Sequence, residues 1–212
     1  MSSVKRAGPF RLILTLAVAG FVSGLVLVTV YVRTAPLILE NQKAAMEAAI
    51  YKVVPGSTTR KAFEVEGNKL VPYEGDGLPM EDAVFAAYDD NGVLLGYGIP
   101  SKGPGFQDTI SLIYGYNPET RTVIGMEVLE SKETPGLGDK IIKDQDFVDN
   151  FKALAIEPEV VAVKAGTRVA ANEVDSISGA TISSKAVVKI INAGNQKFLP
   201  LIAAAHESEE QP

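Results

Sequence analysis

Hydrophobic residues along this chain of 212 residues form one long uninterrupted run, followed by shorter runs with polar breaks. The long run covers residues 12–32 and contains no charged side chain. As an α-helix, this run would measure about 31 Å, close to the roughly 30 Å of hydrocarbon in a lipid bilayer. The pattern therefore predicts a transmembrane helix over residues 12–32.

A cleavable signal peptide is the competing interpretation of this segment, because basic residues precede it. The apolar core of such a peptide is usually about 7–15 residues long, which is shorter than this run. Cleavage after Ala35 would also require a small residue at position 33, which is an arginine. The sequence therefore favours an uncleaved anchor in the cytoplasmic membrane.

Charge is distributed unevenly on the two sides of the predicted span. Three basic residues lie within residues 1–11 and one, Arg33, follows the span, so the positive-inside rule puts residues 1–11 in the cytoplasm and the rest outside it. All 26 acidic residues and 16 of the 20 basic residues lie after Arg33. This acidic balance disfavours binding of the extracytoplasmic part to nucleic acid or to anionic lipid surfaces.

Residues 33–82 are expected to connect the span to a folded domain. Residues 37–54 lack glycine and proline and are rich in alanine, which predicts a helix that ends at Pro55 and Gly56. This helix is equally consistent with a stalk and with the first helix of the domain. The glycines and prolines of residues 67–80 predict a loop-rich connection.

Residues 83–200 have the pattern of a domain that contains a sheet. Strand-like runs flank two turn signals, Asp-Asp-Asn-Gly at residues 89–92 and Asn-Pro-Glu-Thr-Arg at residues 117–121, so two hairpins are expected. Strands joined by hairpins, with the helices kept apart, predict an α+β fold with an antiparallel sheet. Residues 201–212 are predicted to form a disordered acidic tail. The expected strands cover residues 84–88, 93–99, 110–116, 122–130 and 160–164, and the expected helices cover residues 144–154 and 184–199.

The chain has no cysteine and a single histidine, His206. It therefore offers no thiolate to an iron–sulfur cluster, a covalent haem or a zinc ion, and we expect no metal site. Redox chemistry in this chain would need an organic cofactor.

The segment Asp175-Ser176-Ile177-Ser178-Gly179-Ala180-Thr181 places small residues and a threonine directly before the last predicted helix. The free N–H groups and the positive dipole end of a helix N-terminus favour a bound phosphate. The competing interpretation is ordinary capping by Ser183 or Ser184, with no ligand.

A second segment with candidate chemistry, Glu133-Thr134-Pro135-Gly136-Leu137-Gly138, follows the second predicted hairpin. Pro135 and Gly136 suit the two central positions of a type II turn. Leu137, between two glycines, is expected to be exposed unless a flat apolar group covers it. A glycine-rich surface loop without a ligand is the alternative.

Both segments resemble signatures of one family of FMN-binding domains, found in the G subunit of the Rnf complex and in the C subunit of the sodium-pumping NADH:quinone reductase. Asp-x-x-Ser/Thr-Gly-Ala-Thr is the flavinylation motif, in which a flavin transferase joins FMN to the last threonine through a phosphoester. Glu-Thr-Pro-Gly-Leu-Gly is the second signature, and residues 103–106 (Gly-Pro-Gly-Phe) are similar to a glycine-rich stretch of these domains. The resemblance implies one covalent FMN on Thr181, a phosphate held by Ser178, Gly179 and Ala180, recognition of Asp175 by the flavin transferase, and a flavin lined by Glu133, Thr134, Pro135, Gly136, Leu137 and Gly138.

The short length and the Gly-Leu-Gly-Asp-Lys continuation are more similar to the Rnf protein. The resemblance then implies an electron-carrying subunit, without catalytic residues of its own, in a membrane complex that transfers electrons between ferredoxin and NAD and translocates Na⁺ or H⁺. Its partners would be the other Rnf subunits, and Gly20 and Gly24 in the span suit close helix packing. A quinone-reductase subunit and a flavin-free membrane-anchored assembly module are the alternatives.

Overall fold

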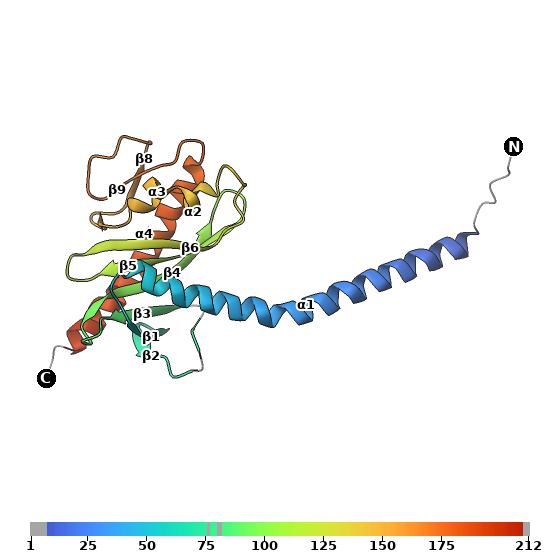
Figure 1. Ribbon diagram of the computed structural model, residues 1–212, viewed down its shortest axis with the longest axis horizontal. Coiled ribbons are helices and arrows are strands. Elements are labelled where there is room, and N and C mark those ends of the chain that lie inside the picture. Colours follow the sequence, from blue (N-terminus) through green and yellow to red (C-terminus); the bar gives the residue numbers. More distant parts are fainter. Residues whose placement is uncertain (1–7, 76, 80–81, 210–212) are drawn as a thin grey trace. The chain divides into compact units, whose positions relative to one another are not determined.

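The computed structural model describes residues 8–75, 77–79 and 82–209 (Figure 1). The first helix, α1 (Pro9–Val53), contains the predicted span and continues through Pro36. The chain divides into two compact units, residues 1–42 and residues 43–212. The helix expected over residues 37–54 is therefore the continuation of the same helix, and its last turns belong to the folded unit.

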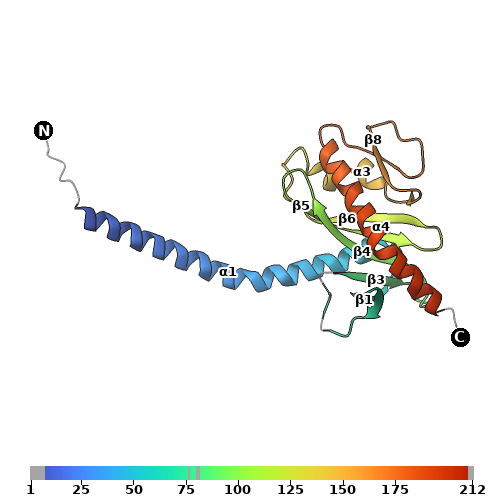
Figure 2. The ribbon, with the colours of Figure 1, turned by 180° about the vertical axis from the view of Figure 1, so that it is seen from behind.

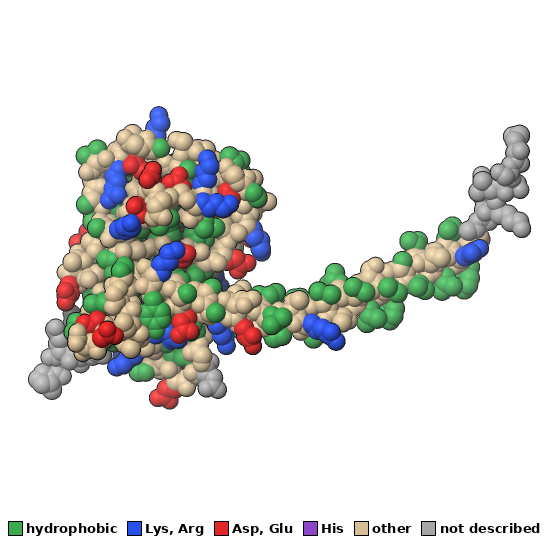
Figure 3. Space-filling view, in the orientation of Figure 1, with side chains coloured by type: hydrophobic (Ala, Val, Ile, Leu, Met, Phe, Trp, Pro, Cys, Tyr) green, Lys and Arg blue, Asp and Glu red, His purple; other side chains and the backbone are tan. Residues whose placement is uncertain are grey.

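The N-terminal unit is an apolar helix with its side chains exposed. An 18-residue window of α1 has a mean hydropathy of 2.5 and none of it is buried by the protein. Figure 3 shows hydrophobic side chains along this part of the helix. Such a helix is long and apolar enough to cross a membrane, in agreement with the predicted single-pass anchor.

The folded unit is built on a seven-stranded sheet with the order β2-β1-β3-β4-β5-β6-β7, in which all neighbours are antiparallel. Two further strands form a small parallel sheet. This arrangement confirms the predicted α+β class. The strands are β1 (Thr59–Glu66), β2 (Lys69–Pro72), β3 (Ala83–Tyr88), β4 (Leu94–Pro104), β5 (Thr109–Asn117), β6 (Thr122–Glu130), β7 (Leu154–Ala155), β8 (Val161–Val163) and β9 (Glu173–Asp175).

Strands β1 and β2 correct the expected boundary of the domain, which the sequence placed at residue 83. β1 pairs with β3 from Thr59 to Glu64, so the sheet begins within the segment expected to connect the anchor to the domain. The charged residues of β1 conceal its alternation: Phe63 and Val65 pack against the core while Arg60 pairs with Glu47 of α1 at 2.9 Å.

The two faces of the sheet carry separate hydrophobic clusters, because successive strand residues point to opposite sides. On one face, Leu112 packs in a large cluster with residues of the last helix, α4 (Thr181–Glu209). On the other face, Ile113 packs with Ile50 and Val53 of α1. Figure 2 shows α4 crossing the strands on its face of the sheet.

The helices after β6 differ in length from the prediction. The expected helix 144–154 is divided into α2 (Lys140–Lys143) and α3 (Gln145–Asp149), and the Asp144 side chain caps α3 by accepting a hydrogen bond from Phe147 N at 3.2 Å. The side-chain amide of Asn150 donates to backbone carbonyls of α3 and ends it.

Helix α4 extends beyond both ends of the predicted helix 184–199. It begins at Thr181 and continues to Glu209, through most of the tail that the sequence predicted to be disordered. Burial explains the extension, since Leu201 and Ile202 are 6% and 1% exposed within the main cluster. Residues 210–212 of the predicted tail lie outside the described residues.

Candidate functional site

The segment from Asp175 to Thr181 forms a tight turn between β9 and α4. Gly179 has a φ of +83°, a left-handed conformation that glycine adopts at little cost, and Ala180 N donates to Ile177 O at 3.0 Å. The Ser184 hydroxyl accepts from Ile177 N and donates to Ala180 O, both at 3.0 Å. Ser184 therefore stabilises the turn from inside the helix and does not cap its start, in contrast to the competing interpretation.

The side chain of Thr181 is exposed at the first position of α4. Its hydroxyl has one long hydrogen bond, to Ile177 O at 3.5 Å, so it is weakly held. Ser178 and Gly179 are exposed beside it, whereas Ala180 is buried. Thr181 is therefore an exposed residue at the start of a long helix.

Asp175 has a role inside the protein that the sequence did not reveal. One carboxylate oxygen accepts from Thr167 N at 3.0 Å and from Arg168 N at 3.1 Å. Its own N–H donates to the side-chain oxygen of Asn150 at 3.1 Å. Asp175 therefore joins the loop before β9 to the end of α3, at the entry to the turn that carries Thr181.

The segment from Glu133 to Gly138 contains the predicted type II turn. Leu137 N donates to Thr134 O at 3.1 Å, and Gly136, at the third turn position, has a φ of +77°. Gly136 N also donates to the Asp139 carboxylate at 2.7 Å. The turn leaves Leu137 52% exposed, as expected.

The two segments meet at the carboxylate of Glu133, which is only 5% exposed. One oxygen accepts from Phe106 N and Gln107 N, each at 2.9 Å, and the other accepts from the hydroxyl of Ser183 in the first turn of α4. The loop after β4, the loop after β6 and the start of α4 are therefore joined by one side chain. The sequence predicted a flavin-lining role for Glu133 and gave no signal for Ser183 beyond capping.

Two glycines make room for this carboxylate. A Cβ on Gly105 would lie 2.5 Å from Glu133 Oε1, and a Cβ on Gly138 would lie 2.7 Å from Glu133 Oε2 and 2.9 Å from Ser183 Oγ. A side chain at either position would therefore force neighbouring atoms to shift. The glycines of residues 103–106 and 133–138 are thus explained in part by one buried group.

Three apolar residues close to this junction along the chain have exposed side chains. Phe106, Leu137 and Ile182 are 64%, 52% and 57% exposed. Phe106 donates its own N–H to Glu133, and Ile182 directly precedes Ser183, which also donates to Glu133. Leu137 directly precedes Gly138, which has no room for a Cβ beside this carboxylate. We call these three residues the apolar platform. Ile182 was not predicted from the sequence as a site residue, although an apolar residue next to Thr181 on the unburied side of α4 was a signal for it.

Hydrogen bonding controls the charge of the junction. Burial by itself raises the pKa of Glu133, but hydrogen bonds from Ser183 and from the N–H groups of Gln107, Phe106 and Asp108 outweigh it and hold the pKa below its usual value. Glu133 is therefore ionised at neutral pH. It is a buried negative charge at the N-terminal end of α4.

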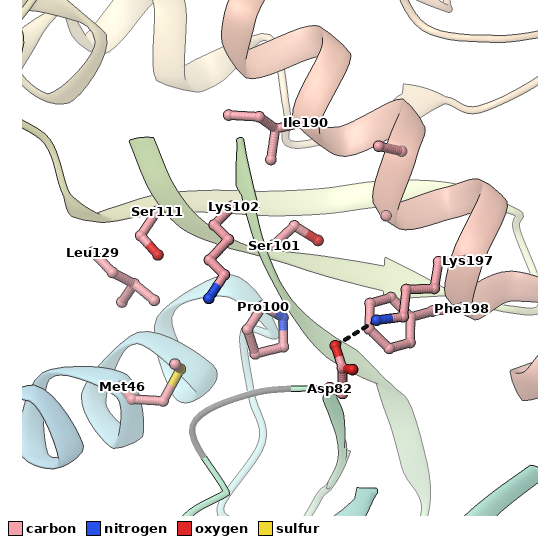
Figure 4. Close-up of a pocket in the computed structure, with 12 residues that line it drawn as sticks. Met46, Asp82, Pro100, Ser101, Lys102, Ser111, Leu129, Ile190, Lys197 and Phe198 are labelled. Carbon is pink, nitrogen blue, oxygen red and sulfur yellow. Dashed lines mark hydrogen bonds and ion pairs between the residues drawn. The ribbon is translucent and has the colours of Figure 1, made fainter. Parts of the chain in front are cut away.

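Two hollows lie near these elements. A cavity of about 310 Å³ between α4 and β4 includes Asp82, which pairs with Lys197, and none of its described lining residues belongs to the two segments (Figure 4). An open groove of about 690 Å³ is lined by residues 175–178 together with Lys140 and Arg168. The groove adjoins the turn, and the exposed Thr181 lies outside its lining.

Comparison with known proteins identifies the family. Residues 105–196 match the FMN-binding domain, a range that contains Thr181 and all three members of the apolar platform. The chain is 30% identical over 192 residues to the G subunit of the ion-translocating oxidoreductase complex of Methanosarcina acetivorans, covering 86% of this chain and 90% of the relative. It belongs to this family of G subunits.

One further relative and one solved structure are also similar to this chain. The G subunit of the Na⁺-translocating ferredoxin:NAD⁺ oxidoreductase complex of Acetobacterium woodii is 28% identical over 163 residues, covering 74% of this chain and 72% of the relative. The crystal structure of the C subunit of Na⁺-translocating NADH-quinone reductase from Parabacteroides distasonis has a TM-score of 0.60 at 23% identity, covering 77% of this chain and 94% of that one. The likeness to this crystal structure shows that this chain and the C subunit share a fold.

The residues of this G subunit suit the FMN that its domain binds. An exposed threonine lies at a helix N-terminus, where a phosphate is favoured. The exposed apolar side chains of Phe106, Leu137 and Ile182 are of a kind that can contact a flat ring. The two glycines make room for the Glu133 carboxylate, which joins the loops to the start of α4 next to Thr181.

Proposed function

We propose that this G subunit relays electrons through an FMN that is attached by a phosphoester to Thr181, within a membrane complex of the ferredoxin:NAD oxidoreductase type. The observation that carries the proposal is the exposed residue Thr181, with its weakly held hydroxyl, at the start of α4 within an FMN-binding domain. The bound flavin supplies the electron-transfer chemistry, and the protein supplies position and electrostatics.

Each part of the site has a task in this proposal. Thr181 Oγ1 holds the phosphate, and the first-turn N–H groups of α4 and the exposed turn at Ser178 and Gly179 stabilise its charge. The flavin ring lies on the apolar platform, so that Leu137 is covered as the sequence predicted. Thr134, Pro135, Gly136 and Gly138 shape the loop that presents Leu137.

Asp175 acts through the turn. Its carboxylate binds the backbone N–H groups of residues 167 and 168. These hydrogen bonds hold Asp175 in place and thereby the beginning of the turn that contains Ser178. A flavin transferase would meet this shaped turn and the adjoining groove, which contains Asp175 among its lining residues. Recognition by the transferase therefore depends on the position of Asp175 as well as on its charge.

The membrane orientation is part of the proposal. Basic residues precede the span, so residues 1–11 face the cytoplasm and the FMN-binding domain lies on the outer side of the membrane. The chain has no native cysteine, which makes Asp90→Cys a unique thiol in an exposed turn. A membrane-impermeant maleimide should label this variant in intact cells, and labelling only after lysis would contradict the orientation.

A pair of single substitutions tests the attachment site. Thr181→Ala should abolish the flavin fluorescence that survives denaturing electrophoresis, because the only proposed ester oxygen is removed. Ser178→Ala should reduce it less, since Ser178 only lines the turn. Fluorescence retained in Thr181→Ala would overturn the proposed site.

Co-purification separates the proposed complex from its alternatives. The protein should co-purify from membranes with the other subunits of a ferredoxin:NAD oxidoreductase. Co-purification with a quinone reductase would favour the second candidate, which the shared fold supports. A chain without any covalent flavin would favour an assembly module.

A further inference from the structure

Glu133 belongs to a loop expected to line the flavin, yet its carboxylate is directed into the protein. It is 5% exposed and accepts hydrogen bonds from two backbone N–H groups of the loop after β4 and from Ser183. All of these donors belong to the protein, so both carboxylate oxygens are occupied without a ligand. A direct contact between Glu133 and the flavin ring is therefore not the role that this geometry supports.

The surroundings of Glu133 are built for this side chain. Gly105 and Gly138, from two different loops, both lie where a Cβ would overlap the carboxylate. Phe106 and Leu137 of the apolar platform are the direct neighbours of these glycines, and Ile182 is the neighbour of Ser183. The carboxylate thus ties together the backbone segments that carry the three platform residues.

Ser183 places this charge close to the attachment point. Ser183 is two residues after Thr181, in the same first turn of α4. A carboxylate bonded to Ser183 therefore lies at the helix end that carries the flavin phosphate. Reduction adds negative charge to a flavin, and a fixed negative charge in a partly buried setting opposes that addition.

We infer that Glu133 is a positioning residue whose buried carboxylate locks the start of α4 to the two platform loops and lowers the reduction potential of the flavin. This inference rests on the proposed attachment of FMN to Thr181. It replaces the ring contact implied by the resemblance with an action through Ser183 and through charge.

The Glu133→Gln substitution removes the negative charge of this side chain while keeping its shape. The amide keeps one oxygen for Phe106 N and Gln107 N, and its other end still reaches the Ser183 hydroxyl, which can also accept a hydrogen bond. The matched control is Asp90→Asn, which removes one charge in the exposed turn before β4. β4 runs from Leu94 to Pro104 and separates this turn from Gly105, a path of roughly 30 Å.

The experiment is a spectroelectrochemical titration of the covalent flavin in the full-length, detergent-solubilised chain. Glu133→Gln should carry as much covalent flavin as the wild type and show a higher midpoint potential, while Asp90→Asn should match the wild type. Equal potentials in all three proteins would overturn the electrostatic part of the inference. An equal upward shift in Asp90→Asn would also overturn it, since the effect would then belong to net charge.

A second measurement tests the lock without any flavin. In the Thr181→Ala background, Glu133→Ala should lower the Tm by roughly 4–8 °C, because buried donors lose their acceptor, and Asp90→Ala should not. An unchanged Tm would overturn the lock. Flavin retained by Thr181→Ala would instead overturn the proposed attachment site. The change in Tm caused by Glu133→Ala would still test the lock.

Discussion

Positions 136 and 138 of the same loop favour glycine for different physical reasons. Gly136 has a positive φ with open space around the position of a Cβ, whereas Gly138 has no room for one beside Glu133 and Ser183. Both substitutions by alanine are expected to destabilise the protein, by about 1–2 kcal/mol for Gly136→Ala and about 1–3 kcal/mol for Gly138→Ala.

Flavin content should distinguish the two glycines. Gly138→Ala displaces the Glu133–Ser183 contact and should reduce covalent flavin, while Gly136→Ala should retain most of it. Absorbance of the denatured, purified proteins measures this directly. The opposite order would show that the backbone turn matters more than the space around the carboxylate.

The pKa of Glu133 gives a pH dependence with a definite sign. Because hydrogen bonds hold this pKa below its ordinary value of 4.5, the ionised group stabilises the folded state at neutral pH, and this contribution is lost as the pH falls through the lowered pKa. The difference in Tm between the wild type and Glu133→Gln should therefore shrink below pH 4.5. A difference that stays constant from neutral to acidic pH would contradict this.

At the scale of elements, helix α4 provides a test of the observed fold. Ile202 is 1% exposed in a segment whose sequence suggested a disordered tail. Ile202→Ala should cost about 2–5 kcal/mol if the side chain is buried as observed. Urea denaturation of the detergent-solubilised protein measures it, and a change below about 0.5 kcal/mol, typical of a surface site, would favour the tail.

The elements that the sequence predicted well have strong local signals. The turn signals at residues 89–92 and 117–121 each join two observed strands, and β6 has the predicted bounds, Thr122–Glu130. β1 escaped prediction because Arg60, Lys61, Glu64 and Glu66 interrupt its apolar pattern. Its position depends on pairing with β3, which is a contact that local patterns do not reveal.

In the candidate site, too, some features were predictable from the local sequence and others were not. The turn at Gly136 and the exposure of Leu137 follow from local chemistry and were predicted. The contact between Glu133 and Ser183 joins residues 50 positions apart, so it depends on the tertiary fold. For the same reason the sequence offered only a possible capping role for Ser183 and left Ile182 without a role.

At the scale of the whole molecule, the anchor and the folded unit should be separable. The compact unit begins at Lys43, and Ile50 and Val53 of α1 are buried in its core. Residues 43–212 should therefore fold and stay soluble without detergent, whereas a chain that begins at residue 54 should lose those core contacts and aggregate. Size-exclusion chromatography and thermal unfolding compare the two, and equal behaviour would contradict the role of α1 in the core.

The central claim is that Thr181 carries the flavin. Trypsin should release residues 169–185 as one peptide, because no lysine or arginine lies between Arg168 and Lys185. This peptide also contains Ser176, Ser178, Ser183 and Ser184 as competing hydroxyl sites. Tandem mass spectrometry of the native protein should locate an FMN phosphoester on Thr181; an unmodified peptide, or FMN on one of the serines, would contradict the account.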